Sequence, residues 1–131
     1  SHATHHYLVA EAFSFIEQLA TRGPRFDVVI VDPPSLVRKR DRNQVKRAMG
    51  VYTKLNRNAM RTVRDGGLLV TASCSNPVSQ EDFFEIVRRA AASARVQTRI
   101  LSYNLHAADH PVDPNFPDGR YLKCAITQVW R

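Results

Sequence analysis

The apolar run at residues 28–31 consists of four consecutive β-branched side chains. It lies between a Gly-Pro pair at 23–24 and a Pro-Pro pair at 33–34. A short continuous run between such turn signals predicts a buried strand, apolar on both faces. Asp32 follows directly, where this strand is expected to end. The two prolines fix φ and remove two backbone donors, so they favour an extended turn that presents the Asp32 carboxylate.

Apolar residues recur at helical spacing in three further stretches, and local signals mark where the predicted helices begin or end. A Gly-Pro pair follows the first, Gly66-Gly67 follows the second, and Ser79 with Asp82 forms a capping box that opens the third. The predicted elements, in chain order, are a strand at 7–10, a helix at 12–22, a strand at 27–32, a helix at 44–63, a strand at 68–72, a helix at 80–94, a strand at 97–105 and a strand at 120–130. This alternation predicts an α/β fold with a mainly parallel sheet, closed by a final hairpin.

The length and composition are those of one globular domain. A chain of 131 residues is long enough for one sizeable core and too short for two. Its 44% hydrophobic and 24% charged residues are ordinary values for a water-soluble protein. No apolar run approaches the ~20 residues of a membrane span, and nothing at the start resembles a signal peptide. We therefore expect one domain over residues 1–131, located in the cytoplasm.

The net charge of +7 comes from 19 Lys and Arg against 12 Asp and Glu. Such an excess favours a polyanionic partner, of which RNA or DNA is the commonest, although a merely basic surface gives the same count. Arg38, Lys39, Arg40 and Arg42 gather part of this charge in the loop after the first apolar run. They are candidates for contacts with phosphates, and a solvated loop is the alternative.

Asp32 and Cys74 each follow a predicted strand and carry reactive side chains. The carboxyl ends of parallel strands meet at one edge of a sheet, so both residues can face one pocket. Cys74 lies between two serines at its strand end, where a thiol is accessible enough to be a nucleophile, although free cysteines are more often buried and inert. Cys124, inside the last predicted strand, fits that buried kind. No spaced cysteine framework indicates a disulfide, which favours a reducing compartment.

Six short motifs occur in an order and at a spacing that resemble one enzyme family. They are Asp32-Pro33-Pro34, Tyr52-x-Lys54-Leu55-Asn56, Gly66-Gly67, Thr71-x-Ser73-Cys74-Ser75, Ala108-Asp109-His110-Pro111-Val112 and Gly119-Arg120-Tyr121-Leu122-Lys123. Over nearly all of residues 7–131, the chain resembles the C-terminal catalytic part of bacterial 23S rRNA (cytosine-5)-methyltransferases that carry an N-terminal PUA domain. Asp-Pro-Pro alone is shared by several methyltransferase groups. The resemblance implies a Rossmann-like class I methyltransferase sheet, S-adenosylmethionine (SAM) as cofactor and RNA, in particular rRNA, as partner.

The same resemblance implies roles for the residues at the two strand ends. Cys74 would add its thiolate to C6 of a cytosine, which makes C5 nucleophilic enough to take the methyl group. Asp32 would hold the N3/N4 edge of the base and stabilise the charge that forms there. Pro33 and Pro34 would shape the base pocket, and Ser73 would border it.

The base that removes the C5 proton is unassigned. His110 is a candidate because histidine titrates near neutrality, and a loop histidine that caps the backbone is an equally good interpretation. Two features favour cytosine C5 as the target. Ser35 stands where enzymes that methylate exocyclic adenine nitrogens usually have an aromatic residue, and related guanine methyltransferases lack a cysteine at the position of Cys74.

The implied cofactor site is incomplete in this sequence. The family binds SAM with a Gly-rich turn after its first strand, and no Gly-x-Gly occurs in this chain. The chain is therefore expected to start near the third strand of a sheet whose order in the family is 3-2-1-4-5-7-6. Glu11 then falls where the family has an acid near the adenine, Ala12 would line the adenine pocket, and Asp32 would also face the cofactor.

Without its first two strands, such a sheet exposes residues 27–32 as an edge that can pair with another chain. We therefore expect a homo-oligomer through this edge, and negligible methyltransferase activity from the chain alone. Two alternatives stay open. One is a SAM-dependent methyltransferase of another substrate, and the other is a non-catalytic RNA-binding or assembly module. A nicotinamide oxidoreductase also has an α/β pattern, but the missing Gly-rich turn argues against it.

Overall fold

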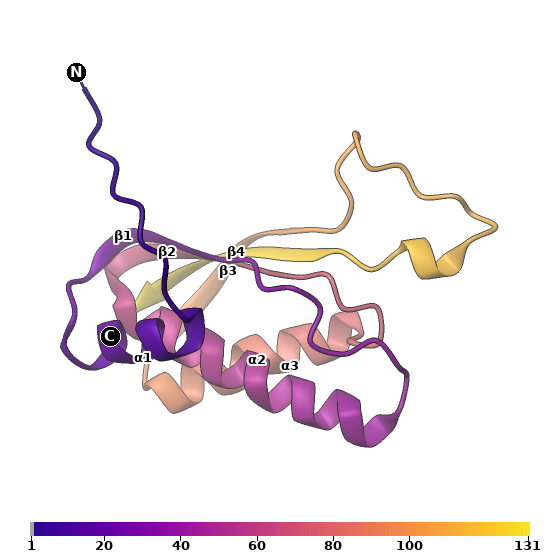
Figure 1. The fold of residues 1–131 in the computed structure, drawn as a ribbon, viewed down its shortest axis with the longest axis horizontal. Coiled ribbons are helices and arrows are strands. Elements are labelled where there is room, and N and C mark those ends of the chain that lie inside the picture. Colours follow the sequence, from indigo (N-terminus) through magenta and orange to yellow (C-terminus); the bar gives the residue numbers. More distant parts are fainter. Residues whose placement is uncertain (1) are drawn as a thin grey trace.

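The computed structural model describes residues 2–131. Its α-helices and its sheet form two layers, with all three α-helices on one face of a four-stranded sheet (Figure 1). The elements are α1 (Ala12–Arg22), β1 (Phe26–Val31), α2 (Arg42–Thr62), β2 (Val63–Ser73), α3 (Gln80–Ala94), β3 (Gln97–Asn104), the 3-10 turn η1 (Pro117–Gly119) and β4 (Lys123–Trp130). No helix among the described residues combines the length and the apolar character that crossing a bilayer requires.

The strands follow the order β1-β2-β4-β3. β1 runs parallel to β2, with Val31 opposite Thr71, whereas β4 is antiparallel to both of its neighbours. This is the 4-5-7-6 part of the strand order that the resemblance implies. The α/β fold with an antiparallel last strand is thereby confirmed, and so is the position of β1 at an edge of the described sheet.

Local capping explains where the helices begin. α1 and α3 occupy the predicted residues, 12–22 and 80–94. Ser79 Oγ accepts a hydrogen bond from Asp82 N at 3.0 Å, and Asp82 Oδ2 accepts one from Ser79 N at 3.1 Å, which completes the predicted capping box. α2 begins at Arg42, two residues before the predicted start, because Asp41 Oδ1 accepts from Asn43 N at 3.0 Å and caps it there.

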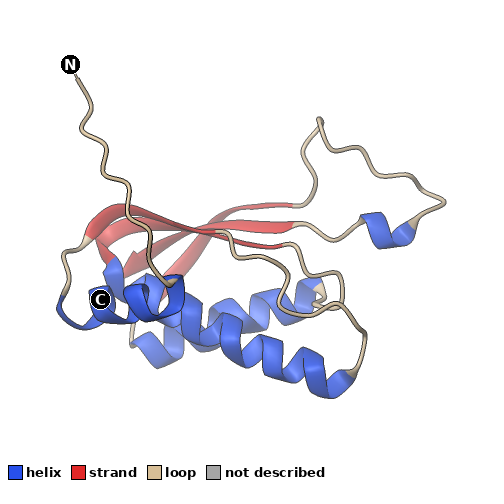
Figure 2. Cartoon of the chain, viewed as in Figure 1, coloured by secondary structure: helices blue, strands red, loops and turns tan. Residues whose placement is uncertain are grey.

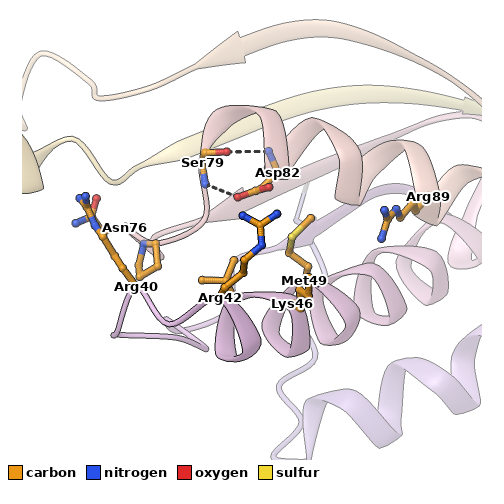
Figure 3. A pocket seen from close by; sticks show the side chains of 10 residues that line it. Arg40, Arg42, Lys46, Met49, Asn76, Ser79, Asp82 and Arg89 are labelled. Atoms are coloured by element: carbon orange, nitrogen blue, oxygen red, sulfur yellow. Dashed lines mark hydrogen bonds between the residues drawn. The ribbon is translucent and has the colours of Figure 1, made fainter.

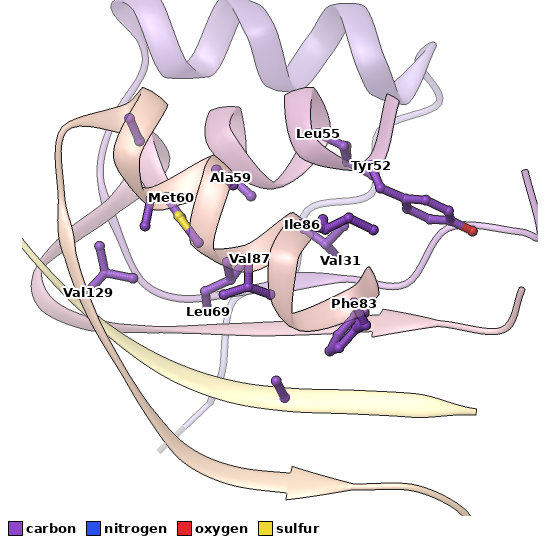
Figure 4. Close-up of a cluster of buried hydrophobic side chains, with 14 of the residues drawn as sticks. Val31, Tyr52, Leu55, Ala59, Met60, Leu69, Phe83, Ile86, Val87 and Val129 are labelled. Atoms are coloured by element: carbon purple, nitrogen blue, oxygen red, sulfur yellow. The ribbon is translucent and has the colours of Figure 1, made fainter. Parts of the chain in front are cut away.

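The core lies between the sheet and the pair α2 and α3, as Figure 4 shows. Its large, fully buried side chains are Tyr52, Met60, Leu69, Phe83, Ile86 and Val129. In β2 and β4 buried and half-buried residues alternate, because successive side chains of a strand point to opposite faces and the helices cover one face. Burying each such side chain contributes about 1.5–3 kcal/mol relative to leaving it in water.

Within residues 2–131, no helix covers the second face of the sheet (Figure 2). Val31 is 7% exposed on the covered side, whereas Val28 and Ile30 are 50% and 70% exposed. The prediction that this apolar run is buried on both faces was therefore wrong. Its alternate side chains need a second layer, and the described residues provide none.

The predicted strand at residues 7–10 is also not formed. Tyr7, Leu8 and Val9 are 90%, 73% and 108% exposed, and residues 2–25 contain no strand. Figure 1 shows this segment running away from the sheet. An isolated extended segment has no neighbour to hydrogen-bond with, so local apolar character does not make it a strand.

The glycine pair lies inside β2 rather than between a helix and a strand. β2 begins at Val63, five residues earlier than predicted, and its pairing with β1 shifts register between Phe26 and Val28. Gly66 has a φ of 77°, which glycine adopts without strain. A Cβ at Gly67 would lie 2.8 Å from the backbone oxygen of Asp27, so the close approach of the two strands requires glycine there.

Candidate active site

The carboxyl ends of β1 and β2 bring the two predicted catalytic residues to one edge of the sheet. Asp32 follows β1 and is exposed, and Cys74 follows β2 and is half-buried. The Cys74 thiol lies 3.8 Å from the backbone oxygen of Pro33, in position for a weak S–H to oxygen hydrogen bond. Pro33 is half-buried and Pro34 exposed. The candidate nucleophile therefore lies directly against the Asp-Pro-Pro turn.

Tyr52 of α2 ties together the loops that follow β1 and β2. Its buried hydroxyl lies 2.6 Å from Ser75 Oγ and accepts from Leu36 N at 3.4 Å. Ser75 Oγ also lies 3.1 Å from Ser35 Oγ. Tyr52 belongs to one of the six motifs and falls in the predicted helix at 44–63, but sequence reasoning assigned it no role. The available signal was its hydroxyl, because a tyrosine on a buried face needs a hydrogen-bond partner.

Lys123 of β4 supports the turn that carries the thiol. It is 4% exposed, and its Nζ donates to the backbone oxygens of Ser75 at 2.9 Å and of Val78 at 2.5 Å. Burial lowers the pKa of Lys123, whereas the charges of Cys74 and Asp82 act in the opposite direction. The ammonium group thus fixes this turn and adds positive charge near Cys74. Lys123 belongs to one of the six motifs, but sequence reasoning assigned it no role.

Ser73 lies beneath the same turn. In the β2–β4 register it stands opposite Lys123, which places both residues on the helix-covered face. Ser73 is fully buried, and its Oγ accepts from Ser75 N at 3.3 Å. The residue predicted to border a substrate base therefore has no exposed surface.

His110 belongs to a separate cluster in the long loop between β3 and β4. Its Nε2 lies 3.0 Å from the Tyr121 hydroxyl, and its ring stacks on His106 at a centroid distance of 5.0 Å. His106 Nε2 in turn accepts from Leu122 N at 3.3 Å. Burial, together with His110 and Lys123, lowers the pKa of His106. Within residues 2–131, no hydrogen bond joins His110 to the Asp32–Cys74 edge.

The predicted cofactor residues Glu11 and Ala12 lie at the start of α1, and both are exposed. The Glu11 carboxylate caps the helix by accepting from Phe13 N at 3.2 Å and Ser14 N at 2.8 Å. The hydrogen bond with Ser14 is the main cause that lowers the pKa of Glu11. In the part of the chain that the structure describes, no hydrogen bond or ion pair connects Glu11 with Asp32.

A cavity of about 700 Å³, named here the basic cavity, opens between the first turns of α2 and the neighbouring α3 (Figure 3). Four cationic side chains line it: Arg40, Arg42, Lys46 and Arg89. Of the four basic loop residues singled out in the sequence, Arg40 and Arg42 therefore line it, whereas Arg38 and Lys39 do not. Sequence reasoning did not single out Lys46 and Arg89, because only the packing of α2 against α3 brings them to the same cavity.

Solved structures share the fold. A crystal structure of a protein named as a methyltransferase and complexed with SAH matches with a TM-score of 0.72 at 19% identity, covering 92% of this chain and 30% of that chain. A protein named as a SAM-dependent methyltransferase from Streptococcus mutans matches with a TM-score of 0.69 at 18% identity, again covering 92% of this chain and 30% of that chain. A methyltransferase homologue from Pyrococcus horikoshii matches with a TM-score of 0.60 at 17% identity, covering 91% of this chain and 43% of that chain. At these identities the likeness shows the fold alone, which is that of a Rossmann-like methyltransferase sheet.

Curated relatives share the name ribosomal RNA large subunit methyltransferase I. The chain is 33% identical over 130 residues to the protein of Shewanella denitrificans, which is 99% of this chain and 32% of the relative. It is 37% identical over 117 residues to that of Vibrio campbellii, with coverages of 89% and 29%. It is 34% identical over 118 residues to the protein of Erwinia tasmaniensis, which is 90% of this chain and 29% of the relative. The chain thus spans about a third of the length of these relatives. No protein-family model matches the chain.

Proposed function

We propose that this chain is the catalytic region of a SAM-dependent methyltransferase that forms 5-methylcytosine in ribosomal RNA. The observation that carries the proposal is the contact between the Cys74 thiol and the Pro33 carbonyl, which holds a candidate nucleophile against the Asp-Pro-Pro turn. The shared name of the relatives supports an rRNA substrate, and the SAH-bound neighbour supports the cofactor. Because the chain spans about a third of these relatives, the proposal assigns the activity to a longer polypeptide.

In this proposal, Cys74 attacks C6 of cytosine as a thiolate and forms a carbon–sulfur bond. The electron pair moves toward N3, and in this role Asp32 acts as a carboxylic acid, whose O–H donates a hydrogen bond to N3, holds the base and stabilises the developing negative charge. C5 then takes the methyl group, a base accepts the C5 proton, and the carbon–sulfur bond breaks to release Cys74. Lys123 is a positioning residue: it holds the turn next to Cys74 through the backbone oxygens of Ser75 and Val78 and does not touch the substrate.

The residues of this chain fit part of SAM, which supplies a methyl group bound to a sulfonium. Each Glu11 carboxylate oxygen accepts one backbone N–H and keeps a lone pair, so it can accept another hydrogen bond from a ribose or adenine. Ala12 and Asp32 present exposed surface for the same cofactor. The chain has no Gly-x-Gly turn that would bring backbone close to the rest of the cofactor. We therefore expect negligible methyl transfer by these 131 residues alone.

RNA that contains 5-fluorocytosine tests the proposal in the longer polypeptide. Fluorine at C5 cannot leave as a proton, so the enzyme stays bound to the RNA after methyl transfer. We expect a covalent complex that requires SAM, disappears in Cys74→Ala and persists in the matched control Cys124→Ala. Absence of the complex, or its survival in Cys74→Ala, would overturn the cytosine-5 assignment.

A non-catalytic RNA-binding module is the second candidate, because the basic cavity is independent of the thiol. RNA binding with a steep salt dependence, without any covalent complex, would favour it.

A further inference from the structure

We propose that the basic cavity holds the phosphodiester strand of the RNA next to the nucleotide that is methylated. The inference rests on the proposed function for its ligand, and it names a surface that the comparisons leave unassigned. Asn76 and Pro77 line the cavity, and both lie in the turn that directly follows Cys74. A base held against Cys74 therefore leaves its neighbouring phosphates on the surface beside this turn.

Three of the four cations in the basic cavity are available to a ligand, whereas Arg89 is held by the Glu85 carboxylate at 2.6 Å. Arg42 and Lys46 are exposed, and within the described residues neither forms an ion pair. Arg40 pairs with Asp118 at 2.9 Å, with side chains 71% and 59% exposed, and a phosphate can replace such a solvated partner at small cost. The one carboxylate that lines the cavity, Asp82, already accepts the backbone N–H of Ser79 in the capping box. The cavity therefore presents a positive surface.

The arrangement of the cations favours an extended polyanion over a single anion. Figure 3 shows Arg40 beside Asn76 at one end of the basic cavity and Arg89 at the other, with Arg42 and Lys46 between them. A volume of about 700 Å³ with an open side accommodates a strand that passes through it. Lysine and arginine placed at intervals along a groove track the backbone of single-stranded nucleic acid. These contacts position the strand, and the choice of base stays with the Asp32–Cys74 edge.

The chain offers a matched control for this charge effect. Arg38 and Lys39 lie in the same loop as the cavity residues but do not line the cavity. Arg88 and Arg89 both bind the Glu85 carboxylate at 2.6 Å, yet only Arg89 lines the cavity. Removing three charges from the cavity and three from these control positions therefore changes the net charge equally.

The experiment compares a cavity variant, Arg42→Gln with Lys46→Gln and Arg89→Gln, with a control variant, Arg38→Gln with Lys39→Gln and Arg88→Gln. The probe is a 12-nucleotide single-stranded RNA with one central cytosine, measured by fluorescence anisotropy at several salt concentrations. Each phosphate contact contributes about 0.7 to the slope of log K against log salt for a single strand. We expect the magnitude of this slope to be smaller by about 2 in the cavity variant, because three cations are removed. We also expect the cavity variant to bind the RNA at least about tenfold more weakly near 0.1 M salt. The control variant should keep most of its affinity and slope.

Equal losses in both variants would show a diffuse basic surface and overturn the proposal, as would unchanged binding in both. Circular dichroism checks that each variant folds. If a triple variant does not fold, the single variants Lys46→Gln and Lys39→Gln are compared in its place. The two proposals fail separately. A 5-fluorocytosine complex formed while both variants bind RNA alike would overturn the cavity proposal alone. Selective loss of binding in the cavity variant without any covalent complex would overturn the cytosine-5 assignment alone.

Discussion

Replacing Tyr52 by phenylalanine removes one oxygen atom from beneath the candidate active site. The Tyr52 hydroxyl bonds to Ser75 Oγ at 2.6 Å and accepts from Leu36 N at 3.4 Å. The ring is 1% exposed and keeps its packing in Tyr52→Phe, so no cavity forms. The substitution therefore isolates the link between the loops that follow β1 and β2.

The expected loss follows from these partners. A buried hydrogen bond contributes about 1 kcal/mol, and leaving its partner unpaired raises the total toward 2 kcal/mol. Ser75 Oγ keeps Ser35 Oγ at 3.1 Å, which limits the second contribution. We expect the free energy of unfolding of Tyr52→Phe to fall by about 1–2 kcal/mol. For a domain of this size, the melting temperature should fall by about 3–8 °C.

Tyr103→Phe is the matched control, because the same atom is removed from a hydroxyl without a partner. The Tyr103 hydroxyl is buried and has no hydrogen bond within the described residues. Burial, with a contribution from Glu81, raises the pKa of Tyr103. The ring keeps its contact with Phe84, at a centroid distance of 4.7 Å. Removing an unpaired buried hydroxyl should leave stability within about 0.5 kcal/mol of the parent protein, or raise it.

Urea denaturation of both variants measures the change in the free energy of unfolding. The rate at which iodoacetamide alkylates Cys74 measures the change in accessibility of the thiol. The alkylation is done in a Cys124→Ala background, so that a single thiol reacts. Tyr52→Phe should speed the alkylation, because the turn after β2 loses an anchor, and Tyr103→Phe should not. Equal stability losses in the two variants, or an unchanged alkylation rate in Tyr52→Phe, would refute the reasoning.

Two other predictions concern the loop after β3 and the edge of the sheet. The pKa of His106 lies below its ordinary value of 6.5 in the folded chain. The unfolded chain therefore binds more protons between the two values, and stability should fall as pH is lowered through that window. Urea midpoints between about pH 7.5 and 5 should show a smaller decrease in His106→Gln, and an unchanged one in His5→Gln. At the edge, Ile30 is 70% exposed on β1, so we expect self-association that sedimentation detects and that Ile30→Lys abolishes. A monodisperse parent monomer would contradict this expectation.

The sequence predicted the helices and their order well, because their signals are local. The apolar spacing and the capping residues of α1 and α3 lie within the elements themselves. The exposure of β1 could not be predicted in the same way. A run of four β-branched residues shows that both faces of a strand are apolar, but not whether a layer covers each face. Ile30 and Val31 are adjacent and chemically alike, yet they are 70% and 7% exposed.

In the candidate site too, residues with local signals could be predicted and residues placed by long-range contacts could not. Asp32 and Cys74 could be predicted together, because each follows a strand and parallel strands end at one edge. The residues that hold this edge in place could not. Tyr52, Ser75 and Lys123 come from a helix, a turn and the last strand, and their hydrogen bonds join positions far apart in the chain. No local pattern encodes such a contact, because the folding of the whole sheet sets the distance.

The proposed chemistry depends on these buried contacts. A thiol at a strand end is a common arrangement, and by itself it does not distinguish a nucleophile from an inert cysteine. What distinguishes Cys74 is that its turn is held by the Tyr52 hydroxyl on one side and by the Lys123 ammonium group below. A covalent catalyst needs its reactive atom held in one geometry through bond formation and release, and rigid supporting contacts provide this. The buried supports therefore fit the proposed covalent role of Cys74, which the Cys74→Ala variant tests directly.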